Sequence, residues 1–390
     1  MKKKIAILGS TGSIGKCLLK IIEKDLALFN VILLSAHKNY KELFNQAKKF
    51  KVKNLIITDY RSFCRAKALN SNKDIKIFNN YNDFNKIFKT KVDYSMSSIV
   101  GLDGLKPTLD IIKYSKTIAI ANKESIICGW SLIKKKLIKH NVNFIPVDSE
   151  HFSIWSSINY KTEGIEKIYL TASGGPFYKR KFSELENIKV SEALKHPTWK
   201  MGKKISIDSA TLANKIFEVI EAGKIFNIEL KKIDIIIHPS SYVHALIKFS
   251  NGLINIIAHD TSMKIPIFNS LYWDNLKTLE TKIINFKKLN SLNFININKI
   301  NFPLLDLIKR VPVRDSLFET AIVSANDYLV KLFLDKKIRF TDISKLLLKA
   351  TNMKKIKNLK KKAPKNLIDI IDAKNITITQ INKLYLKQNV

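Results

Sequence analysis

Acidic side chains are scarce in this 390-residue chain, which has 33 Asp and Glu residues against 68 Lys and Arg residues. Asp148 and Glu150 stand two residues apart after an apolar segment, where an extended chain places both carboxylates on one side. Glu218 is a third acid, on a predicted helix where Asn214 and Lys215 share its face. Three oxygen ligands with no cysteine nearby are typical of a Mg²⁺ or Mn²⁺ site. The structural alternative is a helix-capping acid together with a surface pair between Lys215 and Glu218.

Glycine is also scarce, with 12 residues, yet three of them fall within residues 9–15. An apolar strand precedes this heptapeptide and a helical pattern follows it, as in a Rossmann phosphate turn. Glycines let the backbone approach a pyrophosphate, and the free N–H groups at the start of the helix attract it. Thr11 and Ser13 add hydroxyl donors. The spacing is Gly-x-x-Gly-x-x-Gly rather than Gly-x-Gly-x-x-Gly, and a tight turn without a ligand is the alternative.

The end of the second predicted strand distinguishes NAD from NADP. An NAD site places Asp or Glu there to bind the ribose 2′-hydroxyl. This sequence has His37, Lys38 and Asn39 instead, and Lys38 can neutralise a 2′-phosphate. The pattern therefore favours NADP(H). The alternative is that Lys38 is one more surface lysine in a lysine-rich chain.

Two further segments carry residues suited to substrate binding. Residues 173–176, Ser-Gly-Gly-Pro, follow a predicted strand and form either a plain turn or a backbone nest for a phosphate. Residues 196–202 bring His196 and Trp199 into a long loop. This loop is interpreted either as a lid that closes over a substrate or as a loop anchored by a buried tryptophan. His238 and His244 lie on predicted strands and are expected to be core histidines.

The elements that position these residues predict an α/β fold. Strands alternate with helices at 3–8, 31–34, 55–58, 94–100, 117–120 and 143–147, which predicts an N-terminal Rossmann-like parallel sheet. Strands at 165–171, 233–238, 243–249 and 253–258, with a helix at 209–222 ended by Gly223, predict an α+β catalytic domain with an open, partly antiparallel sheet. Helical patterns at 315–335, 341–350, 365–372 and 377–388 predict a C-terminal helical bundle. The expected domains are 1–148, 149–272 and 301–390, with 273–300 as a linker.

Composition excludes several classes of protein. Hydrophobic residues make up 46%, so the chain is not disordered throughout. No apolar run reaches the ~18 residues of a membrane span. Three unevenly spaced cysteines make a disulfide framework unlikely and favour the cytoplasm. The net charge of +35 resembles that of a nucleic-acid binder, but the basic residues include only six arginines and the lysines are spread over the whole chain.

A set of sequence blocks, taken in order, resembles one known family. The blocks are 9–15, 121–125, 146–151, 173–177, 196–202, 204–211, 214–215 and 237–239. Together they make the chain similar to the 1-deoxy-D-xylulose 5-phosphate reductoisomerases of the methylerythritol phosphate route to isoprenoids. The blocks extend over nearly the whole chain and are jointly specific, although no single block is.

The resemblance implies an enzyme that depends on NADPH and on Mn²⁺ or Mg²⁺ and is usually a homodimer. Such enzymes rearrange 1-deoxy-D-xylulose 5-phosphate to an aldehyde phosphate and reduce it with NADPH to 2-C-methyl-D-erythritol 4-phosphate. The implied metal ligands are Asp148, Glu150 and Glu218, and the implied catalytic residues are Glu150, Glu218, Lys123 and His196. The implied substrate contacts are Lys123, Ser149, Glu150, Ser173, His196, Ser209, Asn214, Lys215 and Glu218. The implied cofactor contacts are Thr11, Gly12, Ser13, Ile14, His37, Lys38, Asn39, Asn122, Glu124 and Gly202, and Trp199 resembles the lid aromatic.

The chain departs from the family pattern at a few positions. His37 stands where the family usually has Gly, Phe152 replaces an Asn, and Ile216 and Phe217 replace Gly and a smaller apolar residue. Residues 259–264 lack the usual Gly-x-Pro-Asp-Met-Arg pattern, and Asp327 stands for a Glu. Because every ligand position is retained, we expect an active enzyme that these changes can slow.

Three rival functions make different predictions. Another NADP-dependent oxidoreductase would need no metal and would not act on deoxyxylulose phosphate. A basic nucleic-acid-binding protein would bind without sequence preference and lose affinity steeply with salt. A decayed relative would bind neither cofactor nor metal.

Overall fold

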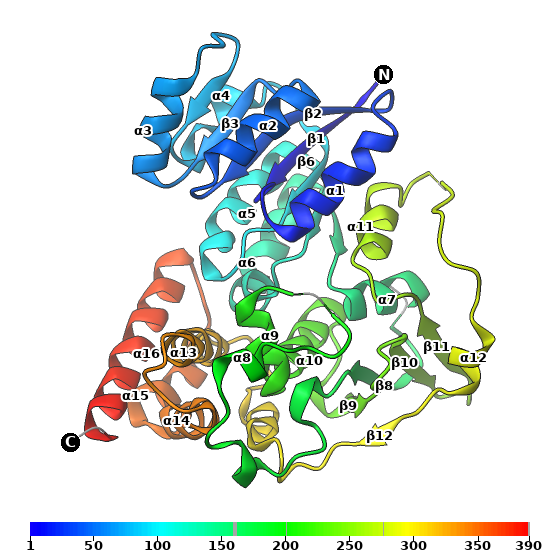
Figure 1. Ribbon diagram of the computed structural model, residues 1–390, viewed down its shortest axis with the longest axis vertical. Coiled ribbons are helices and arrows are strands. Elements are labelled where there is room, and N and C mark those ends of the chain that lie inside the picture. The colour runs from blue at the N-terminus through cyan, green and yellow to red at the C-terminus, as the bar shows by residue number, and fades with distance from the viewer. Residues whose placement is uncertain (159–161, 200, 276, 389–390) are drawn as a thin grey trace. The chain divides into compact units, whose positions relative to one another are not determined.

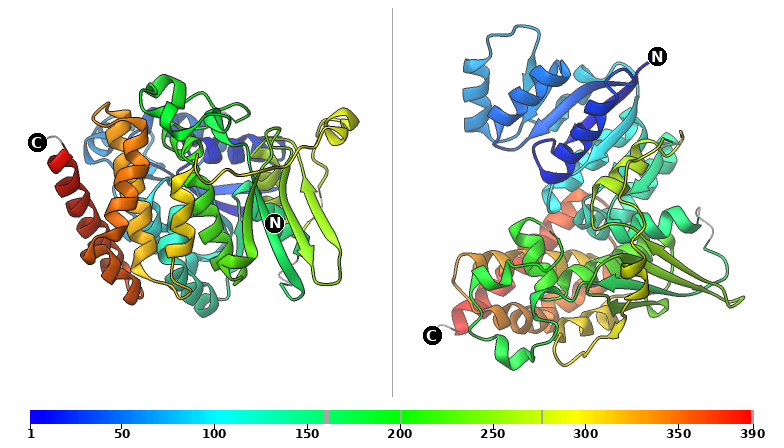
Figure 2. Two further views of the ribbon diagram at one scale, coloured as in Figure 1. Left: turned by 90° about the horizontal axis from the view of Figure 1, so that it is seen from below. Right: turned by 45° about the vertical axis from the view of Figure 1, so that its right-hand side comes forward.

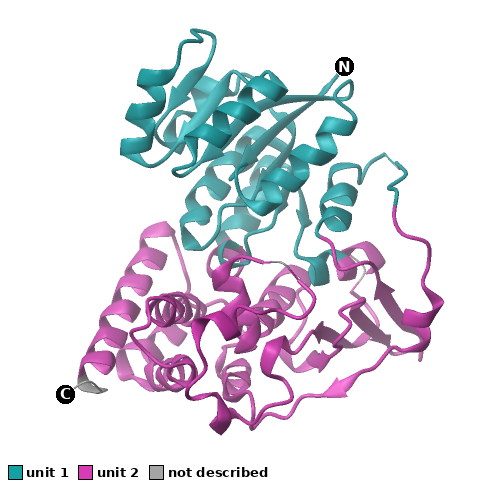
Figure 3. Cartoon of the chain, in the orientation of Figure 1, with its two compact units in different colours: residues 1–125, 132–152, 263–280 teal, residues 126–131, 153–262, 281–390 magenta. Residues whose placement is uncertain are grey.

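The computed structural model describes residues 1–158, 162–199, 201–275 and 277–388. The chain divides into two compact units (Figure 3). Unit 1 comprises residues 1–125, 132–152 and 263–280, and unit 2 comprises 126–131, 153–262 and 281–390. Neither unit is one continuous stretch, whereas each predicted domain is, so the domains 1–148, 149–272 and 301–390 stay a prediction.

Unit 1 is built on a parallel sheet of seven strands (Figure 1). The strands are β1 (Lys3–Leu8), β2 (Phe29–Ala36), β3 (Asn54–Ile57), β4 (Lys76–Phe78), β5 (Val92–Ser97), β6 (Ser115–Ile120) and β7 (Asn143–Pro146). Their order is β4-β3-β2-β1-β5-β6-β7. Central strands such as β1 are buried apolar runs, the pattern expected for strands covered on both faces. The predicted Rossmann-like parallel sheet is confirmed, and the short strand β4 is an addition to it.

Helices connect the strands of unit 1. They are α1 (Ser13–Lys24), α2 (Tyr40–Phe50), α3 (Tyr60–Leu69), α4 (Phe84–Ile87), α5 (Leu105–Ile111) and α6 (Lys123–His140), with 3₁₀ turns η1 (Tyr81–Asp83), η2 (Leu102–Gly104) and η3 (Ile112–Tyr114). A later helix, α11 (Lys264–Leu271), packs against α1. The Tyr272 ring that follows it lies edge-on to Phe29, and its hydroxyl donates to Asp25 at 2.5 Å. These contacts explain why residues 263–280 belong to unit 1.

Unit 2 contains a mixed sheet of five strands in the order β11-β10-β8-β9-β12. The strands are β8 (Ile165–Ala172), β9 (Ile233–Ile237), β10 (Val243–Phe249), β11 (Ile254–Ala258) and β12 (Ile295–Asn296). β8 and β9 pair in parallel, whereas β10 pairs antiparallel with both β8 and β11. The turn of the β10–β11 hairpin holds Gly252 at φ +88°. The predicted open, partly antiparallel sheet is confirmed.

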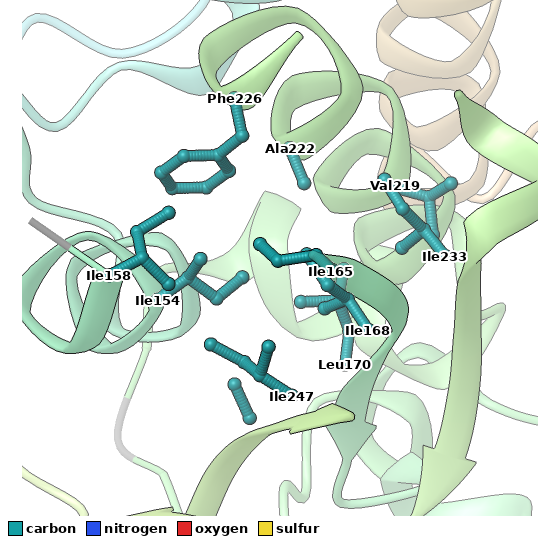
Figure 4. Close-up of a cluster of buried hydrophobic side chains, with 11 residues drawn as sticks. Ile154, Ile158, Ile165, Ile168, Leu170, Val219, Ala222, Phe226, Ile233 and Ile247 are labelled. Atoms are coloured by element: carbon teal, nitrogen blue, oxygen red, sulfur yellow. The ribbon is translucent and has the colours of Figure 1, made fainter. Parts of the chain in front are cut away.

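A cluster of branched aliphatic side chains fills the space beside this sheet (Figure 4). Side chains of β8, β9 and β10 meet those of the helices α7 (Ser149–Ile158) and α10 (Ala213–Phe226), with Ile168, Leu170, Val219 and Ile247 fully buried. The remaining helical elements before β9 are η4 (Gly175–Phe177), η5 (Phe182–Leu185), α8 (Val190–Ala193), α9 (Lys203–Ala210) and η6 (Leu230–Lys232). This packing holds the second half of α10, from Val219 to Phe226, beside β8.

The single helix predicted over 209–222 is wrong in two respects. The structure has two helices, α9 and α10, separated by Leu212, a buried residue in the left-handed conformation at φ +60°. Gly223 does not end the second helix, which continues to Phe226, and Asn227 takes the left-handed cap. A Cβ on Gly223 would lie 2.5 Å from Leu230, so this glycine provides close packing instead.

The C-terminal part of unit 2 is helical, and α13 packs against α14 and α16 (Figure 2). Its elements are η7 (Pro303–Arg310), α13 (Leu317–Leu334), α14 (Phe340–Asn352), α15 (Lys354–Lys357), η8 (Asn358–Lys361) and α16 (Leu367–Gln388). The predicted bundle is confirmed, with the segments at 365–372 and 377–388 joined as one helix. The predicted linker 273–300 contains α12 (Phe286–Asn290) and β12.

Candidate active site

The loop between β1 and α1 has the backbone geometry of a phosphate turn. Gly9 has a φ of +84°, and a Cβ there would lie 2.9 Å from the carbonyl oxygen of Ser98. A Cβ on Gly15 would lie 2.5 Å from the Cα of Ser10, so only glycine lets α1 pack this closely. The order of the strands reverses between β1 and β5, the position where open α/β sheets bind dinucleotides.

The other predicted residues of this turn are at its accessible rim. Gly12 is the N-cap of α1 and provides no side-chain cap, and the first turn of α1 has no acidic residue. Gly12 and Ser13 are exposed, and Thr11 and Ile14 are half-buried. Free N–H groups without a neighbouring carboxylate make this helix start suited to an anion.

The residues after β2 are arranged by local hydrogen bonds. His37 and Lys38 are exposed, and Nδ1 of His37 lies 2.9 Å from the Thr58 hydroxyl. Asn39 is the N-cap of α2, where its Oδ1 accepts the backbone N–H of Glu42 at 3.3 Å. The amide oxygen of Asn39 therefore fixes the start of α2, while the two basic side chains face solvent.

The residues after β6 are more constrained than the sequence indicates. Asn122 caps α6, because its Oδ1 accepts the backbone N–H of Ser125 at 2.6 Å. Its Nδ2 donates to the carbonyl of Gly101 at 2.7 Å and to that of Ile99. These bonds hold the start of α6, where Lys123 and Glu124 are buried.

The acidic pair of unit 1 lies at the start of α7. The predicted extended chain is wrong here, because α7 begins at Ser149 and the backbone carbonyl of Asp148 accepts the N–H of Phe152. A helix start nevertheless keeps the two carboxylates near each other, and oxygens of Asp148 and Glu150 lie within 4.8 Å. The Ser149 hydroxyl donates to Oε2 of Glu150 at 2.5 Å.

Asp148 has cationic and imidazole partners. Lys123 Nζ lies 2.8 Å from its Oδ2, and Nδ1 of His151 lies 3.0 Å from its Oδ1. Burial raises the pKa of Asp148, but Lys123 and His151 together hold that pKa well below its usual range. Asp148 is therefore an anion throughout the neutral range, as a metal ligand must be.

In unit 2, the imidazole of His196 lies between two other predicted substrate residues. Nε2 of His196 lies 2.9 Å from the Ser173 hydroxyl and 3.1 Å from the Ser209 hydroxyl. Its Nδ1 accepts the backbone N–H groups of Thr198 and Trp199 at 3.3 and 2.9 Å. Burial, with the charge of Lys215, lowers the pKa of His196 to about 4. The ring is therefore neutral, with its proton on Nε2, facing the two serines.

The first two turns of α10 hold the remaining predicted substrate residues of unit 2. Asn214 Nδ2 donates to Oε1 of Glu218 at 2.5 Å, and Lys215 forms an ion pair with the other carboxylate oxygen. Lys215 and Glu218 are buried. The shared face predicted from i,i+3 and i,i+4 spacing is confirmed. Leu212, held in its left-handed conformation within an apolar cluster, sets where this face begins.

Comparisons with known proteins assign the chain to a family. Three family models match the chain. The model described as 1-deoxy-D-xylulose 5-phosphate reductoisomerase matches residues 5–129, and the model of the C-terminal domain of that enzyme matches residues 144–226. A third model, described as DXP reductoisomerase C-terminal domain, matches residues 260–378. The chain is 55% identical over 385 residues to the 1-deoxy-D-xylulose 5-phosphate reductoisomerase of Pelagibacter ubique, covering 98% of this chain and 99% of that one. The chain belongs to the 1-deoxy-D-xylulose 5-phosphate reductoisomerase family.

More distant members of the family agree over the whole length. The enzyme of Clostridium tetani is 38% identical, with 88% of this chain and 91% of that one covered. A solved structure of the reductoisomerase from Zymomonas mobilis in complex with NADPH has a TM-score of 0.87 and 31% identity, covering 99% of both chains. A second, in complex with NADPH, fosmidomycin and magnesium, has a TM-score of 0.89 and 29% identity, covering 98% of this chain and 99% of that one. The family predicted from the sequence blocks is confirmed.

The departures from the family pattern leave the polar residues described above in place. Phe152, Ile216 and Phe217 are buried, so the bulkier side chains add to the core. Lys204 Nζ lies 5.4 Å from the centre of the Phe217 ring. Among the described residues, no helix is long and apolar enough to cross a bilayer.

The predicted lid segment leads into α9. Gly202 is the N-cap of α9, and a Cβ there would meet no atom within 4 Å, so sterics do not require glycine. Lys200, within the predicted lid, lies outside the described residues. Trp199 is half-buried and lies edge-on to the ring of His244. His238 and His244 are buried, as predicted for core histidines.

Sequence reasoning missed residues that support the predicted ones. His151, a partner of Asp148, was detectable from its i,i+3 spacing. Ser241, whose hydroxyl lies 3.2 Å from that of Thr198, and His259, stacked on His244, come from distant parts of the chain. No pattern in the sequence places them beside the lid segment.

Proposed function

We propose that this chain converts 1-deoxy-D-xylulose 5-phosphate to 2-C-methyl-D-erythritol 4-phosphate, using NADPH and a divalent metal ion, in the synthesis of isoprenoid precursors. The observation that carries the proposal is family membership combined with intact chemistry in each unit. Unit 1 has the phosphate turn and a buried, ionised Asp148 beside Glu150. Unit 2 has the Ser173–His196–Ser209 group and the acid Glu218.

The donor set fits a hard divalent cation. Asp148, Glu150 and Glu218 are the proposed ligands, and all three provide carboxylate oxygens, the donors that Mg²⁺ and Mn²⁺ prefer. Lys123 and His151 hold Asp148 in place, and Ser149 does the same for Glu150. When bound, such an ion polarises a carbonyl and stabilises charge on neighbouring oxygens.

The residues of the phosphate turn are proposed to hold NADPH. Thr11, Gly12, Ser13 and Ile14 would bind the pyrophosphate through the start of α1. His37 and Lys38, with Asn39, would bind the 2′-phosphate, and Asn122, Glu124 and Gly202 complete the cofactor contacts. The exposed basic pair after β2 explains a preference for NADPH over NADH, because a cation stabilises the extra phosphate.

The substrate is proposed to bind through its two ends. Ser173, Ser209, Asn214 and Lys215 bind the phosphate, since they provide neutral donors and one cation. Lys123, Ser149, Glu150 and His196 face the carbonyl and hydroxyl oxygens. His196, neutral and with a proton on Nε2, donates a hydrogen bond without adding charge. Trp199, on the proposed lid, excludes water from the reduction.

The domain roles and the setting of the enzyme are also proposals. Residues 1–148 form the NADPH-binding domain, 149–272 the catalytic, metal-binding and dimerisation domain, 273–300 a linker and 301–390 a helical domain. The enzyme is proposed to be a cytoplasmic homodimer that binds neither nucleic acid nor membrane.

Consumption of NADPH with 1-deoxy-D-xylulose 5-phosphate, with Mn²⁺ or with EDTA, tests the proposal. We expect turnover that EDTA abolishes and Mn²⁺ restores. Turnover that is independent of metal, or NADPH oxidation only with other carbonyl substrates, would favour another NADP-dependent oxidoreductase. Size-exclusion chromatography with light scattering tests the homodimer separately.

A further inference from the structure

One contact between the proposed lid and the sheet of unit 2 is made by an aromatic ring. Trp199 lies edge-on to His244, with ring centroids 6.2 Å apart and an interplanar angle of 74°. His244 is on β10 and is only 2% exposed. The position of the Trp199 indole therefore depends on the orientation of a buried imidazole.

His244 is in turn held by a second imidazole from the next strand. The rings of His244 and His259 are stacked, with centroids 3.6 Å apart and an interplanar angle of 15°. Nε2 of His244 donates to the backbone carbonyl of His259 at 3.2 Å. A carbonyl accepts only, so this bond fixes the tautomer of His244 as well as its ring plane.

Both ring nitrogens of His259 are engaged. Nδ1 donates to the carbonyl of Asp260 at 2.9 Å, which leaves Nε2 of the neutral ring to accept from the Ser153 hydroxyl at 3.3 Å. The backbone N–H of His259 donates to the carbonyl of Tyr242 at 3.0 Å. The second ring is therefore fixed at its backbone and at both nitrogens, so it forms a rigid support for the first.

We propose that His259 is a positioning residue for the lid, acting through His244 on Trp199, and this inference rests on the proposed function of Trp199 over the substrate. The stacked pair is a built-in contact that orients Trp199 before the substrate binds.

The test compares His259→Ala, which removes the ring, with His259→Phe, which keeps a ring and removes its hydrogen bonds. The first readout needs no activity: acrylamide quenching of Trp199, taken as the difference between each protein and its Trp199→Phe counterpart. We expect His259→Ala to increase quenching of Trp199 and to raise the KM for 1-deoxy-D-xylulose 5-phosphate by about threefold to tenfold, the range of one lost ring contact. The kcat should change less, and His259→Phe should restore most of both effects.

Unchanged quenching and KM in His259→Ala would overturn the proposal. Increased quenching that His259→Phe does not restore would also overturn it, because hydrogen bonding rather than stacking would then hold the lid. If His259→Ala does not fold, His259→Phe decides alone: near-normal quenching supports the inference and increased quenching refutes it. A wild-type protein without turnover would refute the proposed function, while the quenching comparison would still report on the contact.

Discussion

The nucleotide-binding region of unit 1 and the substrate region of unit 2 are built in opposite ways. The phosphate turn is one heptapeptide whose backbone forms the site, with Gly15 packed against Ser10 in the turn itself and Gly9 packed against the backbone of Ser98. The substrate region is assembled from distant segments: Ser173 after β8, His196 in the loop before α9 and Ser209 on α9 meet through hydrogen bonds, and α10 adds Asn214, Lys215 and Glu218. A contiguous site tolerates change around it but not within it, whereas a dispersed site depends on every element that brings its parts together.

The largest effect is expected when the dispersed substrate region loses the carboxylate of Glu218. Glu218→Gln should lower kcat with Mn²⁺ roughly a thousandfold, because several kcal/mol of charge stabilisation are lost with a metal ligand. NADPH affinity should not change, since NADPH is proposed to bind at the phosphate turn of unit 1, which does not include Glu218. Steady-state rates, Mn²⁺ binding by calorimetry and NADPH binding by fluorescence measure the three quantities.

Glu229→Gln is the matched control, since Glu229 is a solvent-exposed acid paired with Lys231. It should keep wild-type rates. Full activity or unchanged Mn²⁺ affinity in Glu218→Gln would remove Glu218 from the proposed ligand set.

The next largest effect is expected when the contiguous phosphate turn is disrupted. Gly15→Val places a side chain where even a Cβ would lie 2.5 Å from the backbone of Ser10. Moving α1 away from the turn should weaken NADPH binding roughly a hundredfold and lower the free energy of unfolding by about 1–3 kcal/mol. Fluorescence titration and thermal melting measure both.

Gly202→Ala is the steric control, because a Cβ at Gly202 meets no atom within 4 Å. Gly202 is the N-cap of α9, where Ala is less favourable than Gly, so the melting temperature should fall slightly but by less than that of Gly15→Val. NADPH binding by Gly15→Val at wild-type affinity would show that close packing of α1 is not required.

The same contrast explains what the sequence could predict. The strands of unit 1 and the phosphate turn were predictable, because buried parallel strands are apolar runs and glycine clusters are local. The short edge strands β4 and β12 lack such runs. The break between α9 and α10 depends on Leu212, whose left-handed conformation is imposed by burial and has no sequence signal.

Within the candidate site, the sequence predicts arrangements inside one element better than arrangements between segments. The face shared by Asn214, Lys215 and Glu218 follows from helix spacing alone. The meeting of Ser173, His196 and Ser209, and the support of the lid by His259, depend on tertiary packing between segments far apart in the chain. Asp148 and Glu150 come close for a reason the sequence interpretation had wrong, a helix start rather than an extended chain.

A smaller effect on NADPH binding is expected from the basic residues after β2 in unit 1. Lys38→Ala should weaken NADPH binding roughly tenfold, the size of one charge-assisted hydrogen bond of about 1.5 kcal/mol. NADH affinity should not change, because NADH lacks the 2′-phosphate. His37→Gly should shift the ratio in the same direction by about twofold, since its ring is already hydrogen-bonded to Thr58.

Lys41→Ala, an exposed lysine of α2 next in the chain, is the matched control and should leave both affinities unchanged. Equal losses of NADPH and NADH affinity in Lys38→Ala would mean that Lys38 acts on the common part of the dinucleotide or on the fold.

The smallest effect concerns the neutral ring at the centre of unit 2. The pKa of His196 is about 4 in the folded protein, against about 6.5 in an unfolded chain. Between these values the unfolded chain binds the extra proton and the folded protein does not, so the free energy of unfolding must fall as the pH falls from 6.5 to 4. His196→Asn removes this group, so the melting temperature of that variant should decline less than the wild type's across this window, by a few degrees at most. Two-dimensional NMR of the ring in metal-free protein gives the direct value. A midpoint near 6.5 would mean that the two backbone N–H groups do not hold Nδ1 as an acceptor, and that the ring of His196 carries a charge below that pH when the substrate binds.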